Sequence, residues 1–412
     1  MRSRRSASRS TASEEPSSAV VITRGASPLF SKSIDRTILG LHWTSGVAPS
    51  LPRRPEAKRI YIDLNHWIGL SKARLGQPED GPYSGALEAL TDGVKSGRLM
   101  LPLSAAHYEE VSAIADPRQR ADIALTMDRL SRYVAIADRA VLLRYQLLAA
   151  LCDWRGVECP PIHSTGVWGR GNAFAFGFDP GGMAVHGPEA LRRRFLRDPA
   201  LLRRIEKAAG SGWTFAEEMR LGEEAAARAL WESSEFAVLR GPSDSDVPGL
   251  RSHGYAPENF RASVDAITKR EADLTRILRE EGKTQLDDIV AARLWIWELN
   301  EPLAWAAAQL GIDPNVVFDA GKKVVTQLLL AMPTMAVEFA LRRANWANGD
   351  YKWTKNDIYD LAALGVAVPY CDVTWTEKHA ASVLNRAHVP AKLGKVVVAT
   401  PQDLLGHVRS LE

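Results

Sequence analysis

The sequence is poor in cysteine and has no long apolar run. Only three cysteines occur in 412 residues, and their spacing matches neither a C-x-x-C metal site nor a C-x-x-C redox site. The most apolar stretch is interrupted by Gln327 and Pro333, so it falls short of the roughly 18 residues that cross a bilayer. We therefore expect a reduced, cytoplasmic protein with no membrane-spanning segment.

Neither basic nor acidic residues predominate in the whole chain, but the two kinds are unevenly distributed along it. The chain has 52 Lys and Arg against 49 Asp and Glu, yet residues 1–59 hold eleven basic residues and four acids. The first 20 residues are rich in Ser and Arg without an apolar stretch, which argues against a secretory signal. Residues 1–50 show no periodicity, so we predict a disordered or loosely packed basic leader, with nucleic-acid binding as the alternative.

Two strand-then-helix units follow the leader. Residues 59–64 alternate β-branched and aromatic side chains up to Asp63, and a helical pattern begins directly afterwards. A second short strand is predicted at 99–103, before a helix that Ser104 would cap. Repeated strand-to-helix units are typical of α/β winding, which we predict for residues 51–116.

The middle of the chain predicts a different architecture. Charged outer faces and helical spacing recur in the segments 119–152, 189–209, 217–239, 259–281, 286–310 and 322–345. A Gly- and aromatic-rich segment near 162–182 predicts an ordered loop or hairpin between helices. Its GRG is not interpreted as a phosphate loop, because no strand precedes it and no Lys-Ser/Thr follows. Residues 117–349 are therefore predicted to be a large all-helical insertion.

The strand and helix alternation returns near the end of the chain. Thr354 would cap a helix, residues 370–376 read as a strand, and residues 395–399 read as a buried strand. We predict one α/β domain with a parallel sheet, formed by residues 51–116 and 350–412 and interrupted by the insertion.

Acidic residues would gather at one edge of such a sheet. Loops and helix N-termini converge at the carboxyl ends of parallel strands. The acids expected there are Asp63, Glu109 or Glu110, Asp357, Asp360, Asp372 and Glu377. Closely gathered carboxylates repel one another unless a cation neutralises them, and oxygen ligands without Cys or His favour Mg²⁺ or Mn²⁺. Such a site can activate water for phosphodiester hydrolysis.

Each acid also has a purely structural interpretation. Asp357 follows Thr354 at capping-box spacing, and Asp360 could complement the positive end of the same helix. Asp372 could be a turn residue at a strand end. Asp63 is harder to explain in this way, because a carboxylate directly after Ile-Tyr-Ile is expected to be partly buried and to need a partner.

These segments resemble the successive acidic motifs of PIN-domain nucleases. The resemblance rests on the strand ending in Asp63 and on the segments LPLSAAHYEEV, NDIYDLAAL and PYCDVTWTEKH, and it covers residues 59–116 and 350–412. It implies a Rossmann-like three-layer α/β/α fold and cleavage of RNA that depends on Mg²⁺ or Mn²⁺. The family includes bacterial toxin nucleases and RNA-processing enzymes. The insertion and the long leader depart from its compact members.

The resemblance also implies roles for individual residues. By position in the motifs, the predicted catalytic set is Asp63, Glu110, Asp357 and Asp372. Asp360 and Glu377 are further predicted metal ligands. Asp360 is also the alternative to Asp357, Glu377 the alternative to Asp372, and Glu109 the alternative to Glu110. Glu377 directly follows Thr376, and family members commonly place an acid after a strand-ending Thr.

Other residues extend the predicted site. His66 and His107 lie close in sequence to proposed acids. Each could bind a metal ion or transfer a proton, and the alternative for each is a structural role. Basic residues interleaved with Trp and Tyr before the NDIYD helix are predicted to bind single-stranded RNA, the alternative being a solvated linker with packed aromatics. These basic residues are Arg342, Arg343, Lys352 and Lys355.

The predicted function is therefore a metal-dependent endoribonuclease. A toxin or defence role follows only from the resemblance. The helical insertion would shape substrate access or bind a protein partner or inhibitor. Two alternatives remain open: a structure-specific DNA nuclease, and a non-catalytic scaffold that acts through its helical region.

Overall fold

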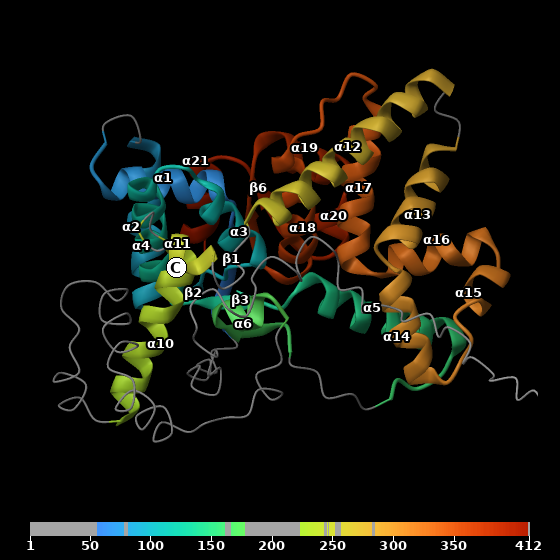
Figure 1. The fold of residues 1–412 in the computed structure, drawn as a ribbon, viewed down its shortest axis with the longest axis horizontal. Helices are drawn as coiled ribbons and strands as arrows, with labels where there is room; N and C mark the ends of the chain where they lie inside the picture. Colours follow the sequence, from blue (N-terminus) through green and yellow to red (C-terminus); the bar gives the residue numbers. More distant parts are fainter. Residues whose placement is uncertain are drawn as a thin grey trace, which may run out of the picture.

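The computed structural model describes most of the chain after residue 55. The described residues are 56–77, 81–160, 166–177, 223–242, 245, 247–251, 257–281 and 285–410. The predicted leader and the predicted helix at 189–209 lie outside these ranges. A small sheet lies near the centre of the molecule, with helices from both ends of the chain around it (Figure 1).

The central sheet has four parallel strands in the order β2-β1-β5-β6. The strands are β1 (Lys58–Ile62), β2 (Leu99–Met100), β5 (Val373–Trp375) and β6 (Val396–Val398). Ile60 lies opposite Val373, so segments more than 300 residues apart pair directly. The strands are rich in Ile and Val and largely buried, as expected for a parallel sheet covered by helices. The prediction of a parallel sheet built from both chain ends is confirmed.

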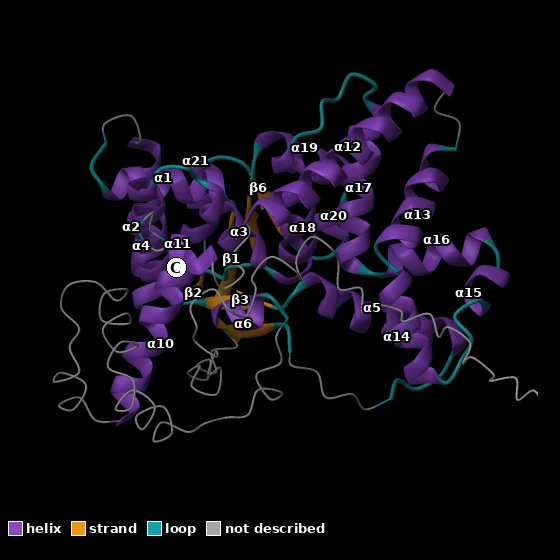
Figure 2. Cartoon of the chain, in the orientation of Figure 1, coloured by secondary structure: helices purple, strands orange, loops and turns teal. Residues whose placement is uncertain are grey.

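Helices from both chain ends pack around the sheet. The N-terminal helices are α1 (Leu64–Arg74), α2 (Gly81–Lys95), α3 (Ala105–Ala113) and α4 (Pro117–Ser131). The C-terminal helices are α18 (Lys355–Tyr370), α19 (Lys378–Arg386), α20 (Val389–Lys392) and α21 (Pro401–Arg409). In Figure 2, α1, α2 and α21 lie to one side of the strands, and α17 (Pro333–Ala347) and α18 lie to the other. Helix α2 contacts α21 and β2, whereas α18 contacts α3 and β5.

The region predicted to be all-helical contains two strands. β3 (Val134–Ile136) pairs antiparallel with β4 (Trp168–Arg170), which leads into α6 (Gly171–Ala175). The amide of Leu103 donates to the Val134 carbonyl at 2.8 Å, which joins this pair to the chain that leaves β2. The predicted helix at 119–152 is therefore two helices, α4 and α5 (Arg139–Arg155), separated by β3. The part of the predicted loop or hairpin near 162–182 that the structure describes, residues 166–177, contains β4 and α6.

The remaining described elements are helices. They are α10 (Glu223–Arg240), α11 (Val247–Arg251), α12 (Pro257–Glu281), α13 (Leu286–Trp297), α14 (Asn300–Leu310), α15 (Val316–Asp319) and α16 (Lys322–Ala331). The segment 322–345 forms α16 and α17 rather than one helix, because Pro333 at the start of α17 cannot continue the preceding hydrogen-bond ladder. Helix α18 continues to Tyr370, where a strand was predicted to begin.

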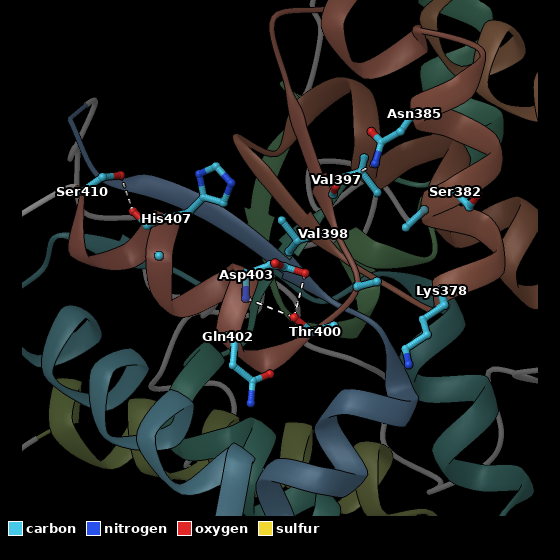
Figure 3. Close-up of a pocket in the computed structure, with 13 residues that line it drawn as sticks. Lys378, Ser382, Asn385, Val397, Val398, Thr400, Gln402, Asp403, His407 and Ser410 are labelled. Atoms are coloured by element: carbon cyan, nitrogen blue, oxygen red, sulfur yellow. Dashed lines mark hydrogen bonds between the residues drawn. The ribbon is translucent and has the colours of Figure 1, made fainter.

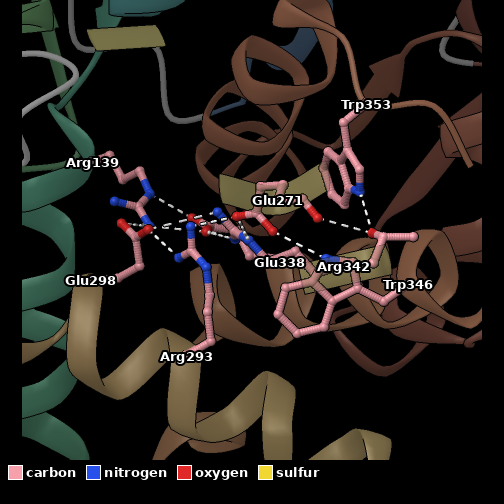
Figure 4. Close-up of polar contacts among 9 residues, drawn as sticks. Arg139, Glu271, Arg293, Glu298, Glu338, Arg342, Trp346 and Trp353 are labelled. Atoms are coloured by element: carbon pink, nitrogen blue, oxygen red, sulfur yellow. Dashed lines mark hydrogen bonds and ion pairs between the residues drawn. The ribbon is translucent and has the colours of Figure 1, made fainter. Parts of the chain in front are cut away.

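A buried ionic network joins several helices of the middle region (Figure 4). Three Arg and three Glu alternate in it, with side chains at most 9 % exposed: Arg139, Glu271, Arg293, Glu298, Glu338 and Arg342. The Trp346 indole also donates to Glu271 at 3.1 Å. Equal numbers of opposite charges let the network stay ionised in the core, so α5, α12, α13 and α17 are fixed relative to one another.

No single described helix is long and apolar enough to cross a membrane. Helices α16 and α17 meet the length and composition test only as a pair, with a bend of 107° between them.

Candidate active site

The two distant parts of the sheet bring Asp63 and Glu377 to the same edge. Asp63 directly follows β1, and Glu377 comes two residues after the parallel strand β5. The Asp63 amide donates to the Trp375 carbonyl at 2.9 Å, and the Thr376 hydroxyl donates to the Asp63 carboxylate at 2.9 Å. The Asn65 side chain donates to Glu377. Hydrogen bonds therefore join the residues that follow β1 to those that follow β5.

Asp63 and Glu377 have the same backbone conformation at equivalent places. Each is the N-cap of the following helix, with φ −63° and ψ 153°, and neither side chain makes a capping hydrogen bond. Asp116 and Asp138, by contrast, cap α4 and α5 with their carboxylates. Asp63 and Glu377 thus occupy capping positions without a side-chain capping hydrogen bond, and their carboxylates instead accept from Thr376 and Asn65.

Glu110 and Asp360 complete a group of four acids. Glu110 lies on α3 and Asp360 on α18, and these two helices pack against each other. Burial raises the pKa of Glu110, and the negative charges of Asp63, Asp360 and Glu377 raise it further. We call Asp63, Glu110, Asp360 and Glu377 the acidic cluster.

The pKa of every member of the acidic cluster is raised. For Asp63 the cause is burial, partly offset by the Thr376 hydroxyl and by nearby backbone amides. For Asp360 the causes are burial and the charges of Asp63, Glu377 and Asp357. Burial, Asp63 and Asp357 raise the pKa of Glu377, and His379 lowers it. Among the described residues, the charges that shift the pKa of Glu110 and Asp360 are thus negative, which is the environment that a cation stabilises.

The composition of the acidic cluster fits a hard divalent cation. All its ligand atoms are carboxylate oxygens, as Mg²⁺ and Mn²⁺ prefer. In the part of the chain that the structure describes, however, no group of three or more His, Cys, Asp or Glu is arranged to hold a metal ion.

Glu109 faces a different environment from Glu110. Its side chain is 5 % exposed, and neither carboxyl oxygen has a hydrogen-bond partner among the described residues. Burial raises its pKa, and the charges of Glu110 and Asp138 add to the effect. The charges of Asp63, Asp360 and Glu377 raise the pKa of Glu110, whereas those of Glu110 and Asp138 raise that of Glu109.

Asp372 does not belong to the acidic cluster. It precedes β5, so it lies at the amino end of a strand whose carboxyl end leads to Glu377. Its carboxylate accepts a hydrogen bond from the Arg59 amide at 2.9 Å and pairs with Lys395 at 3.5 Å. The structure therefore corrects the predicted place of Asp372: it lies at the amino end of β5, away from Asp63, whereas Glu377 lies at the carboxyl end beside Asp63.

Asp357 has a capping role. Its carboxylate accepts hydrogen bonds from the Thr354 amide at 2.6 Å and the Thr354 hydroxyl at 2.7 Å, and Tyr351 donates to it as well. Asp357 thus forms the capping box that its spacing predicts. Asp360, one turn later, is the acid of this helix that interacts with Asp63.

The four basic residues predicted to bind RNA do not form one surface. Arg342 is 3 % exposed and belongs to the buried network, so it is corrected from a substrate contact to a structural residue. Arg343 pairs with Asp287, and Lys355 pairs with Asp265. Lys352 is exposed. Trp346 and Trp353 are buried, as the packed-aromatic alternative requires.

Figure 3 shows a groove that the sequence did not predict. Its volume is about 900 Å³, and it runs past β6 between α19 and α21. Its polar lining includes Lys378, Asn385, Thr400 and Gln402. Lys378 directly follows Glu377, and Thr400 follows β6 at the carboxyl edge of the sheet. No sequence motif marks the groove, because its lining comes from single polar residues on three elements.

Folding stability should depend on pH through the acidic cluster. The four acids bind protons more tightly in the folded protein than in the unfolded chain, so their stabilising contribution is present below their ordinary pKa of about 4 and is lost as pH rises through the raised values. We compare the free energy of unfolding of Asp360→Asn and the parent in the presence of a chelator. Above about pH 4 we expect this free energy to fall less steeply with rising pH in the variant than in the parent. Urea denaturation at several pH values measures this, and an unchanged slope would contradict it.

No family model, curated protein or solved structure matches this chain.

Proposed function

We propose that the protein is a metal-dependent endoribonuclease with a PIN-like, Rossmann-related three-layer domain. One observation carries the proposal: Asp63 and Glu377 lie at the carboxyl edge of a parallel sheet, and the charges of both raise the pKa of Glu110 on α3 and of Asp360 on α18. Ligand sites of open α/β sheets lie at this edge. The sequence resemblance supplies the reaction type.

The acidic cluster would hold one or two Mg²⁺ or Mn²⁺ ions. When bound, such ions lower the pKa of water and offset charge on phosphate oxygens. The residues around the acidic cluster would hold the four carboxyl groups in position. Thr376 orients the Asp63 carboxylate, and Asn65 holds Glu377. Packing of α3 on α18 holds Glu110 and Asp360 at the same site.

Single-stranded RNA is the substrate that fits the surroundings best. The groove past β6 includes Lys378, which directly follows Glu377, and offers Lys378 and Gln402 as hydrogen-bonding groups. Asn385 and Thr400 also line it but bond to the Val397 carbonyl and to Asp403. A cation beside the reaction centre and polar groups along the groove suit a phosphate backbone with unpaired bases. The helical region, fixed by its buried network, would control access or bind a protein partner or inhibitor.

The proposal is tested by incubating the purified chain with a labelled single-stranded RNA in Mn²⁺, with a matched reaction in chelator. We expect internal cleavage in Mn²⁺ only. Single-stranded DNA, DNA flaps and DNA hairpins of the same sequence are offered in parallel. Cleavage of DNA alone would replace the proposal by a DNA nuclease, and no cleavage of any substrate would favour a non-catalytic scaffold.

The toxin role needs its own test. If the nuclease acts on cellular RNA as toxins of the resembled family do, induced expression should arrest growth, and Asp63→Asn should abolish the arrest. Normal growth at high expression of the parent would contradict a toxin role and leave the enzymatic proposal in place.

A further inference from the structure

Two buried histidines, His66 and His107, lie beside the acidic cluster without belonging to it. His66 is 7 % exposed and lies on α1, which follows β1. His107 is fully buried on α3, which follows β2. Burial lowers the pKa of each imidazole to about 4, so both rings are neutral near pH 7.

The partners of His107 define its tautomer. The Ser104 amide donates to Nδ1 at 3.0 Å, and Nε2 lies 2.8 Å from the Ile62 carbonyl. A backbone amide can only donate and a carbonyl can only accept, so the proton is on Nε2. His107 thus holds the carbonyl of the residue that directly precedes Asp63.

His66 has the same arrangement at the other strand. Its Nε2 lies 3.1 Å from the Thr376 carbonyl, and its Nδ1 lies 3.0 Å from the Tyr83 hydroxyl. The carbonyl again requires the proton on Nε2, so Tyr83 donates to Nδ1. The ring is stacked on Trp375 with centroids 4.0 Å apart. His66 thus holds the carbonyl of the residue that directly precedes Glu377.

We infer that His66 and His107 are positioning residues for the acidic cluster. Each uses an Nε2–H to fix the last carbonyl before an acid, at the two strand ends where Asp63 and Glu377 share one backbone conformation. Both ring nitrogens of each histidine already have a partner, so neither histidine is free to bind a metal ion or to transfer a proton.

Fixing these carbonyls matters because the acids leave their strands directly afterwards. A rotation of the peptide between Ile62 and Asp63 would move the Asp63 carboxylate away from Glu377, and the same holds for the peptide between Thr376 and Glu377. Reactive groups must be held within about 0.5 Å of their productive places, and residues that support metal ligands change affinity or activity by about 10- to 100-fold. The inference rests on the proposed nuclease function.

Replacement by leucine and by glutamine tests the inference. Leucine removes both hydrogen bonds of a histidine. Glutamine can replace both bonds: its amide oxygen can accept as Nδ1 does, and its amide nitrogen can donate as Nε2–H does. In both side chains the acceptor and the donor are bonded to the same carbon. We expect His107→Leu and His66→Leu to lower kcat for RNA cleavage about 10- to 100-fold, with KM little changed and Mn²⁺ affinity reduced. His107→Gln and His66→Gln should recover most of both losses.

The readouts separate the possible failures. Circular dichroism first establishes that each variant is folded at the assay temperature. Folded leucine variants with parental kcat and Mn²⁺ affinity, or glutamine variants no better than leucine, would overturn the positioning role while the nuclease proposal stands. A parent without Mn²⁺-dependent cleavage would overturn both. Should the leucine variants not fold, long-range ¹H–¹⁵N spectra of the parent decide: two Nε2–H tautomers are expected, and an Nδ1–H ring would contradict the inference.

Discussion

Asp63→Asn is expected to lower kcat for RNA cleavage by about a thousandfold without lowering stability at neutral pH. Asparagine is the same size and can still accept the Thr376 hydroxyl, but it carries no negative charge for a cation. Burial raises the pKa of Asp63, which means that its ionised form costs folding free energy. Removing that charge should leave the variant at least as stable as the parent.

The measurement pairs single-turnover cleavage kinetics with urea denaturation of the same samples. Asp372→Asn is the matched control, because Asp372 has the same side chain but lies at the other end of the neighbouring strand. We expect the control to cleave RNA at close to the parental rate. Equal cleavage by Asp63→Asn and the parent would remove Asp63 from the active site.

Glu271→Ala is expected to destabilise the protein by about 3–5 kcal/mol. Glu271 is fully buried, and its carboxylate pairs with Arg293 and Arg342 and accepts a hydrogen bond from Trp346. Truncation leaves buried guanidinium charge without its partner, and this costs far more than the network gains from one ion pair.

Urea denaturation followed by circular dichroism measures the loss. Asp287→Ala is the control, because Asp287 pairs with Arg343 at the exposed surface and its removal should cost at most about 1 kcal/mol. A loss for Glu271→Ala no larger than that of the control would show that the buried network does not hold the helical region together.

The main sheet could be predicted from sequence because its strands carry local signals. The apolar run before Asp63 and the run 395–399 give strand patterns, and Thr354 marks a helix start that the structure confirms. The break between α4 and α5 carries no such signal. Arg132 and Tyr133 adopt positive φ values of 48° and 57° without glycine or proline, so the segment looks helical throughout.

Part of the candidate site could also be predicted from local sequence patterns. An acid directly after a clear strand, as at Asp63, has a defined position at the sheet edge. Asp372 was misplaced because its position in the PYCD motif was given more weight than its place near the start of the predicted strand 370–376; the structure also has it at the amino end of the strand. Arg342 was misplaced because Glu271, its buried partner, lies 71 residues away and no local pattern indicates the pairing.

Direct binding of Mn²⁺ is the measurement that most closely tests whether the two chain ends create a shared cation site. Electron paramagnetic resonance titration of the parent at neutral pH should show bound Mn²⁺. Asp63→Asn and Glu377→Gln should each weaken binding at least about tenfold, because each removes one carboxylate ligand, and Asp372→Asn should bind as the parent does. A parent that binds no Mn²⁺, or identical affinity in all four proteins, would contradict the account.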